Sequence, residues 1–156
     1  MKKRFLTPYL RNTLWDLGYA LDTLETCLPW ATLGSAREAI LPKIKHGLAD
    51  ENEPVLAFSH ISHVYTNGGS LYITYLYRRA ADPHQTLSRW QKLKSAASQE
   101  IVAQGGTITH QHGVGLDHRP YLPAEKGSLG MQMIGNLIET VDPQRIMNPG
   151  KLIDLD

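Results

Sequence analysis

The sequence predicts an α+β domain in which two helices cover one face of an antiparallel sheet. Two segments with the period-two alternation of strands flank an Asn-Gly turn at residues 66–69, which indicates a hairpin. A stretch with helical spacing of apolar residues lies on each side of this hairpin, and a further alternating segment precedes the first of them. The 156 residues suffice for one domain with a buried core.

The first predicted strand begins at Tyr19 and stops at Pro29. Its threonines are β-branched and favour extended backbone, whereas proline lacks the N–H that a strand ladder requires. Both faces of this strand carry polar residues. We interpret Glu25 as a rim or edge group, because glutamate side chains are mostly exposed.

The first predicted helix is capped by Thr32 or Ser35 and continues to about Leu48. Apolar residues recur along it close to the i, i+3, i+4 spacing of a buried face. Pro42 lies inside this pattern and is expected to kink or split the helix, because it removes one hydrogen bond and crowds the preceding turn.

The predicted hairpin joins a strand at residues 55–65 to a strand at residues 70–79. Strict alternation places His60 and His63 on opposite faces of the first of these strands. Two such histidines cannot bind one metal ion unless a bulge lies between them, and at least one of them is expected to be a structural residue with satisfied hydrogen bonds.

The second predicted helix starts with Asp82 as cap and Pro83 in its first turn, and Gly105 ends it. A short strand is expected at residues 107–109. The order of elements is then βαββαβ, the ferredoxin-like arrangement, with one sheet face uncovered. The residues expected on the inner face of this helix are Leu87, Trp90, Lys94, Ala97 and Ile101.

Three parts of the chain follow from this order. Residues 1–18 form an N-terminal lead-in, residues 19–110 form the ferredoxin-like core, and residues 111–156 hold a His- and Gly-rich loop, a helical extension and a tail. The helical extension lies within residues 122–141, and the Asp142-Pro143 pair ends it.

Composition excludes several classes of protein. The net charge of +1 argues against a broad electrostatic surface for nucleic acid, and no run approaches the ~18 apolar residues that span a bilayer. Polar residues and Pro8 interrupt any signal-peptide core after the basic N-terminus. Cys27 is the only cysteine, so no intrachain disulfide forms and a cytoplasmic location is expected.

Chemistry-bearing residues concentrate in residues 105–122. This stretch holds three of the seven histidines and four of the thirteen glycines, a composition that is poor core material. Glycine permits close approach of the backbone to a ligand, and histidine titrates near neutral pH. The residues alone leave open whether this is a ligand-binding loop or an ordinary surface loop.

Five ordered segments resemble the C-terminal portion of FAD-linked oxidases of the vanillyl-alcohol oxidase type. More narrowly, they are similar to alkyl-dihydroxyacetonephosphate synthase and its bacterial relatives. The segments cover nearly the whole chain. They are DTLETCLPW, HISHVYTNGGSLYITYLYR, GGTITHQHGVG, DHRPYL and, after the Asp142-Pro143 pair, IMNPGKL.

The resemblance implies a cap, or substrate, domain that covers the isoalloxazine of FAD with its open sheet face. Tyr72 matches the catalytic tyrosine of the synthases, and His110 and His112 match two histidines of their triple-histidine motif, so these three are the catalytic candidates. The implied cofactor-contacting residues are Gln111, Gly113 and Asn148. The implied substrate-binding residues are His60, His63 and Arg119.

No metal is expected on this resemblance. In the related glycolate and D-lactate dehydrogenases, a loop glutamate and two upstream histidines help to hold a divalent metal. Here Gln111 replaces that carboxylate, and Tyr72 stands near the second of those histidine positions. His118 lies past the matched histidines and is interpreted as a loop or packing residue.

The leading functional hypothesis is the cap domain of an FAD-dependent oxidoreductase that acts on a small molecule. An alkylglycerone-phosphate synthase-like transferase is the alternative, and a non-enzymatic binding or dimerisation module that uses the bare sheet face is the third. No phosphate-cradling motif occurs, so an FAD-binding domain or subunit is the expected partner. The chain alone is expected to be inactive.

Overall fold

The computed structural model describes residues 9–154 and has the predicted α+β, ferredoxin-like architecture with a C-terminal helical extension. Its sheet is antiparallel and has the strand order β1-β3-β2, so the strand that ends the hairpin is central. Residues 1–8 of the predicted lead-in and residues 155–156 of the tail lie outside the described residues. The strands are β1 (Tyr19–Pro29), β2 (Leu56–Val64) and β3 (Gly68–Arg78).

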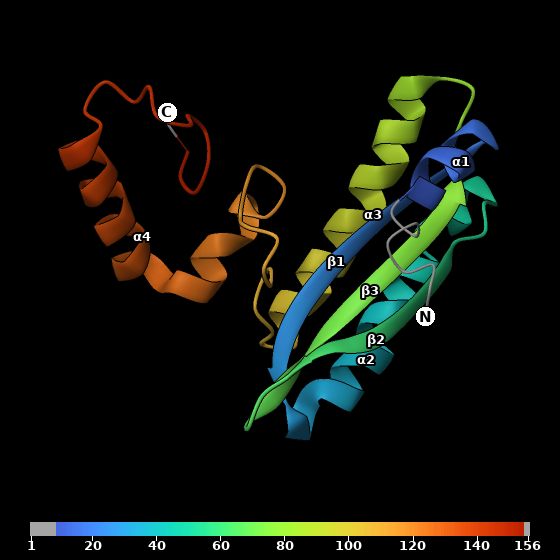
Figure 1. Cartoon of the computed structure of the whole chain (residues 1–156), viewed down its shortest axis with the longest axis horizontal. Coiled ribbons are helices and arrows are strands. Elements are labelled where there is room, and N and C mark those ends of the chain that lie inside the picture. The colour runs from blue at the N-terminus through green and yellow to red at the C-terminus, as the bar shows by residue number, and fades with distance from the viewer. Residues whose placement is uncertain (1–8, 155–156) are drawn as a thin grey trace.

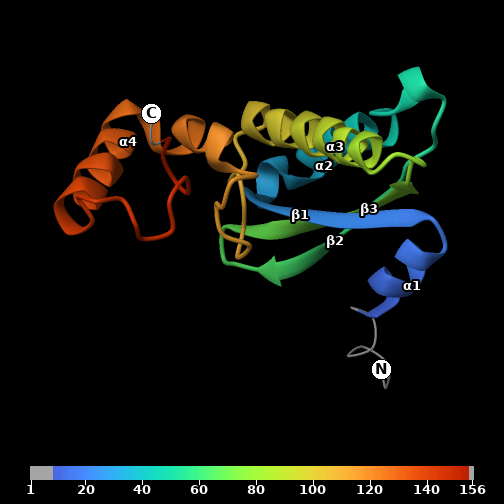
Figure 2. The same cartoon turned by 90° about the horizontal axis from the view of Figure 1, so that it is seen from above.

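Two helices cover one face of the sheet, and the other face stays largely open (Figure 2). The helices are α1 (Leu10–Asp16), α2 (Trp30–Lys45), α3 (Pro83–Ala103) and α4 (Leu122–Val141). Helices α2 and α3 form the covering layer, whereas α1 lies on the opposite side, near one end of β1, and α4 extends away from the sheet (Figures 1 and 2). Within residues 9–154, no helix is both long and apolar enough to cross a membrane.

Alternation along the central strand separates a dry face from a polar face. Leu71, Ile73 and Tyr75 of β3 point into the helical layer and are almost completely buried. Ser70 and Tyr72 alternate with them and face the open side. The open face therefore carries hydroxyl groups at its centre.

Helix α2 remains continuous through Pro42, so the expected split is wrong. The helix begins at Trp30, directly after Pro29, and ends at Lys45, two residues before the Gly47 backbone that packs against Leu93. Its buried residues supply enough packing to outweigh the one hydrogen bond that proline removes. Those residues are Leu33, Ala36, Ile40, Leu41 and Ile44.

Helix α3 begins as predicted, with Asp82 accepting a hydrogen bond of 2.9 Å from the His84 backbone N–H. Among its leucines, the buried face differs from the prediction. Leu87 is 51% exposed, whereas Leu93, which the predicted stripe omitted, is 0% exposed and packs in the core. Leu87 therefore lies on the outer side of α3, whereas its neighbours Thr86 and Arg89 are buried.

The predicted fourth strand at residues 107–109 does not form. Thr107 instead donates one backbone hydrogen bond to the Cys27 carbonyl at 3.2 Å. Its side chain accepts from the Cys27 N–H at 2.8 Å, and its carbonyl accepts from the Thr26 hydroxyl at 2.8 Å. A Cβ on Gly106 would lie 2.4 Å from Thr26 Oγ1, so only glycine allows this approach. These contacts anchor the start of the loop to the edge of β1.

A half-buried carboxylate, Asp22, ties β1 to α3 and the core. Its Oδ2 accepts hydrogen bonds from Trp90 Nε1 at 2.7 Å, Tyr75 Oη at 3.2 Å and Lys94 Nζ at 3.4 Å. Burial raises the pKa of the Asp22 carboxyl. The charge of Lys94 and the hydrogen bonds outweigh that effect, so the net pKa lies below its ordinary value.

Replacing Leu93 with Ala is expected to lower the free energy of unfolding by about 2–5 kcal/mol, because the truncation leaves a cavity in the core. The matched replacement Leu87→Ala, on the same helix, is expected to change it by no more than about 0.5 kcal/mol because Leu87 is half exposed. Urea unfolding monitored by circular dichroism measures both. Equal losses would contradict the observed orientation of α3.

Replacing Asp22 with Asn is expected to cost about 1–3 kcal/mol at pH 7, because it weakens the hydrogen bonds and removes the charge that faces Lys94. The folded-state pKa of Asp22 is depressed, so its contribution to stability is present above the unfolded pKa of about 3.9 and is lost as the pH falls through the folded-state pKa. Urea unfolding of both proteins across this range should show the difference shrinking on acidification. A difference that is constant with pH would show that Asp22 contributes nothing through its charge.

Candidate functional site

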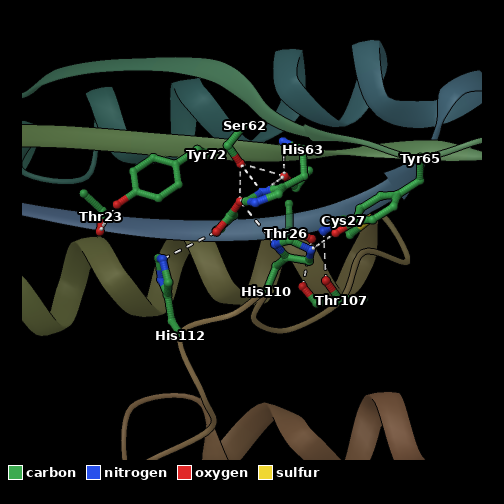
Figure 3. A network of polar contacts seen from close by, with 12 residues as sticks. Thr23, Thr26, Cys27, Ser62, His63, Tyr65, Tyr72, Thr107, His110 and His112 are labelled. Carbon is green, nitrogen blue, oxygen red and sulfur yellow. Dashed lines mark hydrogen bonds and ion pairs between the residues drawn. The ribbon is translucent and has the colours of Figure 1, made fainter. Parts of the chain in front are cut away.

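A buried glutamate, Glu25 of β1, lies at the centre of a polar cluster on the open sheet face. Its side chain is 2% exposed. Ser62 and His63 of β2 and His110 and His112 of the loop converge on its carboxylate (Figure 3). Glu25 does lie on an edge strand, as predicted, but the expectation that it is exposed there is wrong, because the loop that follows α3 covers it.

A β-bulge at Ser62 brings both β2 histidines to this face. His60 pairs with Tyr72 and His63 pairs with Ser70, and the register shifts between Ile61 and His63. Since Tyr72 and Ser70 are two residues apart on β3, their partners share a face. The expectation that His60 and His63 face opposite ways is thus overturned by one extra residue.

Two serines hold the carboxylate from the strand side. The Ser62 hydroxyl donates to Glu25 Oε1, and its oxygen lies 2.7 Å from Ser70 Oγ. Ser70 is 0% exposed and also accepts from the His63 backbone N–H at 2.9 Å. These bonds link the bulge, the central strand and Glu25 into one network.

Two imidazoles hold the carboxylate from the loop side. His110 Nδ1 lies 3.2 Å from Glu25 Oε1, and His112 Nε2 lies 3.4 Å from Oε2. The second ring nitrogen of His110 lies 2.8 Å from the Tyr65 hydroxyl. Gln111, between the two histidines, is exposed and has a left-handed φ of +59°. The loop backbone therefore turns at Gln111 so that both neighbouring rings reach Glu25.

Tyr72 lies beside this cluster on the open face. Its hydroxyl donates to Thr23 Oγ1 at 3.2 Å. Its ring stacks on His60 at a centroid distance of 5.2 Å and meets the His112 ring edge-on at 5.5 Å. The structure thus brings together five of the sequence-predicted site residues (His60, His63, Tyr72, His110 and His112), with His63 reaching the site through the bulge.

Opposing effects set the pKa of the Glu25 carboxyl. Burial raises this pKa. The hydrogen bonds from Ser62 and Ser70 and the charge of His110 lower it by more than burial raises it, so the net pKa lies below its ordinary value. Glu25 is therefore a carboxylate at neutral pH, although it is almost inaccessible to water.

Three other predicted residues lie near the C-terminal tail instead. Gly113 and Asn148 line one cavity of about 440 Å³ between the loop, the end of α4 and the tail. Arg119 donates to the Gly150 carbonyl at 2.9 Å and pairs with Asp154 at 3.2 Å, so it holds the tail and contacts no member of the Glu25 cluster.

His118 is buried in the loop, with Nδ1 3.2 Å from the Val114 carbonyl. Burial lowers the pKa of its imidazole, and the nearby Lys94 charge lowers it further. His118 is thus held as a neutral packing group in the loop, away from the Glu25 carboxylate.

Sequence reasoning missed Glu25, Ser62, Ser70 and Tyr65 as members of the site. The bulge has no marker in the sequence, since Ser62 lies in an otherwise regular alternation. Tyr65 follows the end of β2 and contributes through one hydrogen bond to His110. A weak signal did exist for Glu25, because Thr23, Glu25 and Cys27 form a polar row on one face of β1.

The arrangement suits two kinds of chemistry. Imidazoles beside a buried carboxylate can hold or transfer a proton, since the carboxylate orients the ring and favours its charged form. Imidazole and carboxylate groups are also the common ligands of divalent transition metals. The Tyr72 hydroxyl adds a proton donor or acceptor on the exposed side.

Comparisons with known proteins are consistent across the chain. A family model described as "FAD linked oxidases, C-terminal domain" matches residues 1–152. The chain is 32% identical to alkyldihydroxyacetonephosphate synthase of Dictyostelium discoideum over 153 residues, or 97% of this chain and 24% of that protein. It is 24% identical to the uncharacterized FAD-linked oxidoreductase YgcU of Escherichia coli (strain K12) over 136 residues, or 86% of this chain and 28% of that protein.

A solved structure of alkyldihydroxyacetonephosphate synthase has the same fold over most of the chain. The TM-score is 0.64 at 27% sequence identity, and the match covers 96% of this chain and 24% of that chain. The chain therefore spans about a quarter of the length of the relatives that it matches.

Replacing Ser70 with Ala is expected to lower the free energy of unfolding by about 1–3 kcal/mol, because a buried hydroxyl that serves Ser62 and the His63 N–H is lost. The matched replacement Ser35→Ala removes an exposed hydroxyl that bonds only the Thr32 carbonyl, and is expected to cost less than about 0.5 kcal/mol. Urea unfolding midpoints check the pair. A Ser70→Ala protein as stable as Ser35→Ala would show that the cluster is not preassembled.

Proposed function

Because the chain belongs to the FAD-linked oxidase C-terminal domain family, we propose that it is the substrate-binding cap domain of an FAD-dependent oxidoreductase. The observation that carries this proposal is the meeting of Tyr72 and His112 on the open sheet face, at a ring distance of 5.5 Å. His112 Nε2 lies 3.4 Å from a buried carboxylate, on the face that the two covering helices leave free.

The residues of this chain suit a surface that faces a flavin. Gly113 and Gly115 have positive φ values, and nothing lies within 4 Å of the position of an added Cβ at either glycine. A flat group can therefore approach the loop backbone closely. Gly113 and Asn148 line the same cavity, which supports their assignment as cofactor-contacting residues. FAD, when bound, supplies the acceptor for the electrons of the substrate.

The proposed acid–base groups are Tyr72 and His112. His112 is the more accessible of the two loop imidazoles, and Glu25 Oε2 at 3.4 Å stabilises it in the protonated form after it takes a proton from a substrate hydroxyl. The Tyr72 ring lies against the same imidazole, and its hydroxyl is held by a hydrogen bond to Thr23 Oγ1. His60, stacked on Tyr72, completes the exposed wall that a small substrate would contact.

His110 is less suited to direct proton transfer than the sequence expectation held. Its side chain is 14% exposed, and both ring nitrogens have close neighbours, Glu25 on one side and Tyr65 on the other. We assign it a role in holding the cluster together.

A synthase-like transferase is the second candidate function. The similarity to the Dictyostelium synthase supports it, because that match extends over 97% of the chain. The two candidates differ in their redox outcome. An oxidoreductase leaves the flavin reduced after anaerobic reaction with its substrate, whereas a net exchange of an acyl for an alkyl group leaves the flavin oxidised.

In the FAD-loaded enzyme that this chain forms with its FAD-binding domain, Tyr72→Phe and His112→Ala are each expected to lower kcat by about 100-fold or more, because each removes a general acid–base group. Steady-state turnover with the accepted substrate measures this. The controls are Tyr77→Phe, a buried tyrosine on the helical face, and His84→Ala, an exposed histidine at the start of α3. They are expected to retain kcat within about threefold. Unchanged turnover in both site variants would refute the assignment.

A further inference from the structure

We propose that Glu25, His63 and His110 bind one divalent metal ion of the zinc type. The ligand atoms are the carboxylate Oε1 and the Nδ1 atom of each imidazole, and they lie within 4.8 Å of one another. The three residues come from β1, β2 and the loop after α3. Such a site goes beyond the acid–base role proposed above, and it is tested by metal binding without any measurement of activity.

The distances between the ligand atoms fit tetrahedral coordination. His63 Nδ1 lies 3.4 Å and His110 Nδ1 lies 3.2 Å from Glu25 Oε1. For zinc bonds of roughly 2.0–2.1 Å, two ligand atoms of a tetrahedron are separated by about 3.3 Å. Two of the three separations therefore match those of a zinc site, and the third, between the two Nδ1 atoms, is at most 4.8 Å.

Glu25 offers a buried carboxylate to a cation. The carboxylate is 2% exposed, and among the described residues the groups within ion-pairing distance of it are the imidazoles of His63, His110 and His112. A divalent ion bound at Oε1 pairs directly with this buried charge and is held by the lone pairs of two of these rings.

His110 has the outer-shell partner that metal-bound histidines usually have. Its Nε2 lies 2.8 Å from the Tyr65 hydroxyl, which can accept the ring proton and leave Nδ1 with a free lone pair. Nδ1 is buried and has no hydrogen-bond partner, although Glu25 Oε1 is only 3.2 Å away, because the two are not aligned for a hydrogen bond. Two atoms that lie this close without a hydrogen bond between them are arranged like two ligands of the same metal ion.

The bulge at Ser62 and the β1 glutamate explain why the sequence did not predict this site. The loop has Gln111 where a carboxylate was sought, and strict alternation placed His63 on the wrong face. In the folded chain, β1 supplies the carboxylate and the bulge turns His63 toward it. Two imidazoles and one carboxylate leave coordination positions for water or substrate, as in catalytic zinc sites.

Isothermal titration calorimetry of the full 156-residue chain with ZnCl₂ measures the stoichiometry and affinity of zinc binding and so tests the proposal. One ion per chain is expected to bind, and Co²⁺ is expected to give the intense visible absorption of a tetrahedral site. Glu25→Gln and His110→Ala are expected to weaken zinc binding by about 100-fold or more because each removes a ligand. Glu38→Gln and His84→Ala, exposed residues on α2 and α3, are the matched controls and should bind as the unmodified chain does.

Tyr65→Phe gives a second arm that does not depend on replacing a buried residue. Tyr65 is 44% exposed, so the variant should fold, and loss of its hydroxyl is expected to weaken zinc binding by about 10–100-fold through the His110 ring. Tyr19→Phe, on an exposed tyrosine at the start of β1, is the control. Absence of zinc binding to the unmodified chain, binding that Glu25→Gln leaves unchanged, or equal losses in a control variant would each overturn the proposal.

Discussion

The constraint on which the site depends is the burial of one carboxylate, Glu25, in the middle of an edge strand. A buried carboxylate must be surrounded by donors or cations, since water cannot reach it. The chain meets this requirement from two directions, with Ser62 from the neighbouring hairpin and His110 and His112 from the loop. The pairing of β2 with β3 and the path of the loop are therefore tied to the same group.

Two structural devices make that convergence possible. The bulge at Ser62 adds one residue to β2, which returns His63 to the face of Glu25 and brings the Ser62 hydroxyl within reach of it. Thr107 binds the edge of β1 at Cys27, two residues beyond Glu25, and so starts the histidine loop beside the carboxylate. A regular fourth strand would have continued along β1 and covered more of its edge. Because the loop contacts β1 only around Thr107, the residues after it can turn back over the open face.

One face of the sheet carries the hydrophobic core, and the other carries the polar groups of the candidate site. The helical face is packed with apolar side chains such as Leu24, Ile73 and Leu93, whose burial stabilises the fold independently of the site. The open face carries the polar cluster, with Tyr72 and His60 at its exposed side. Because α2 and α3 occupy only one face, residues on the other can serve a ligand or a neighbouring domain without loss of core packing.

The sequence by itself determined the order of the elements from β1 to α3, the hairpin turn, the Asp82 cap and the family, because each depends on residues that are close together along the chain or on a long ordered match. It also predicted that Tyr72, His110 and His112 belong to one site. Only the tertiary structure decided that His60 and His63 share a face, that Leu93 rather than Leu87 is buried, and that Glu25 is central. The reason is physical: a bulge is defined by strand pairing, and the burial of Glu25 depends on a loop anchored to β1 by residues 81 positions apart, Thr26 and Thr107.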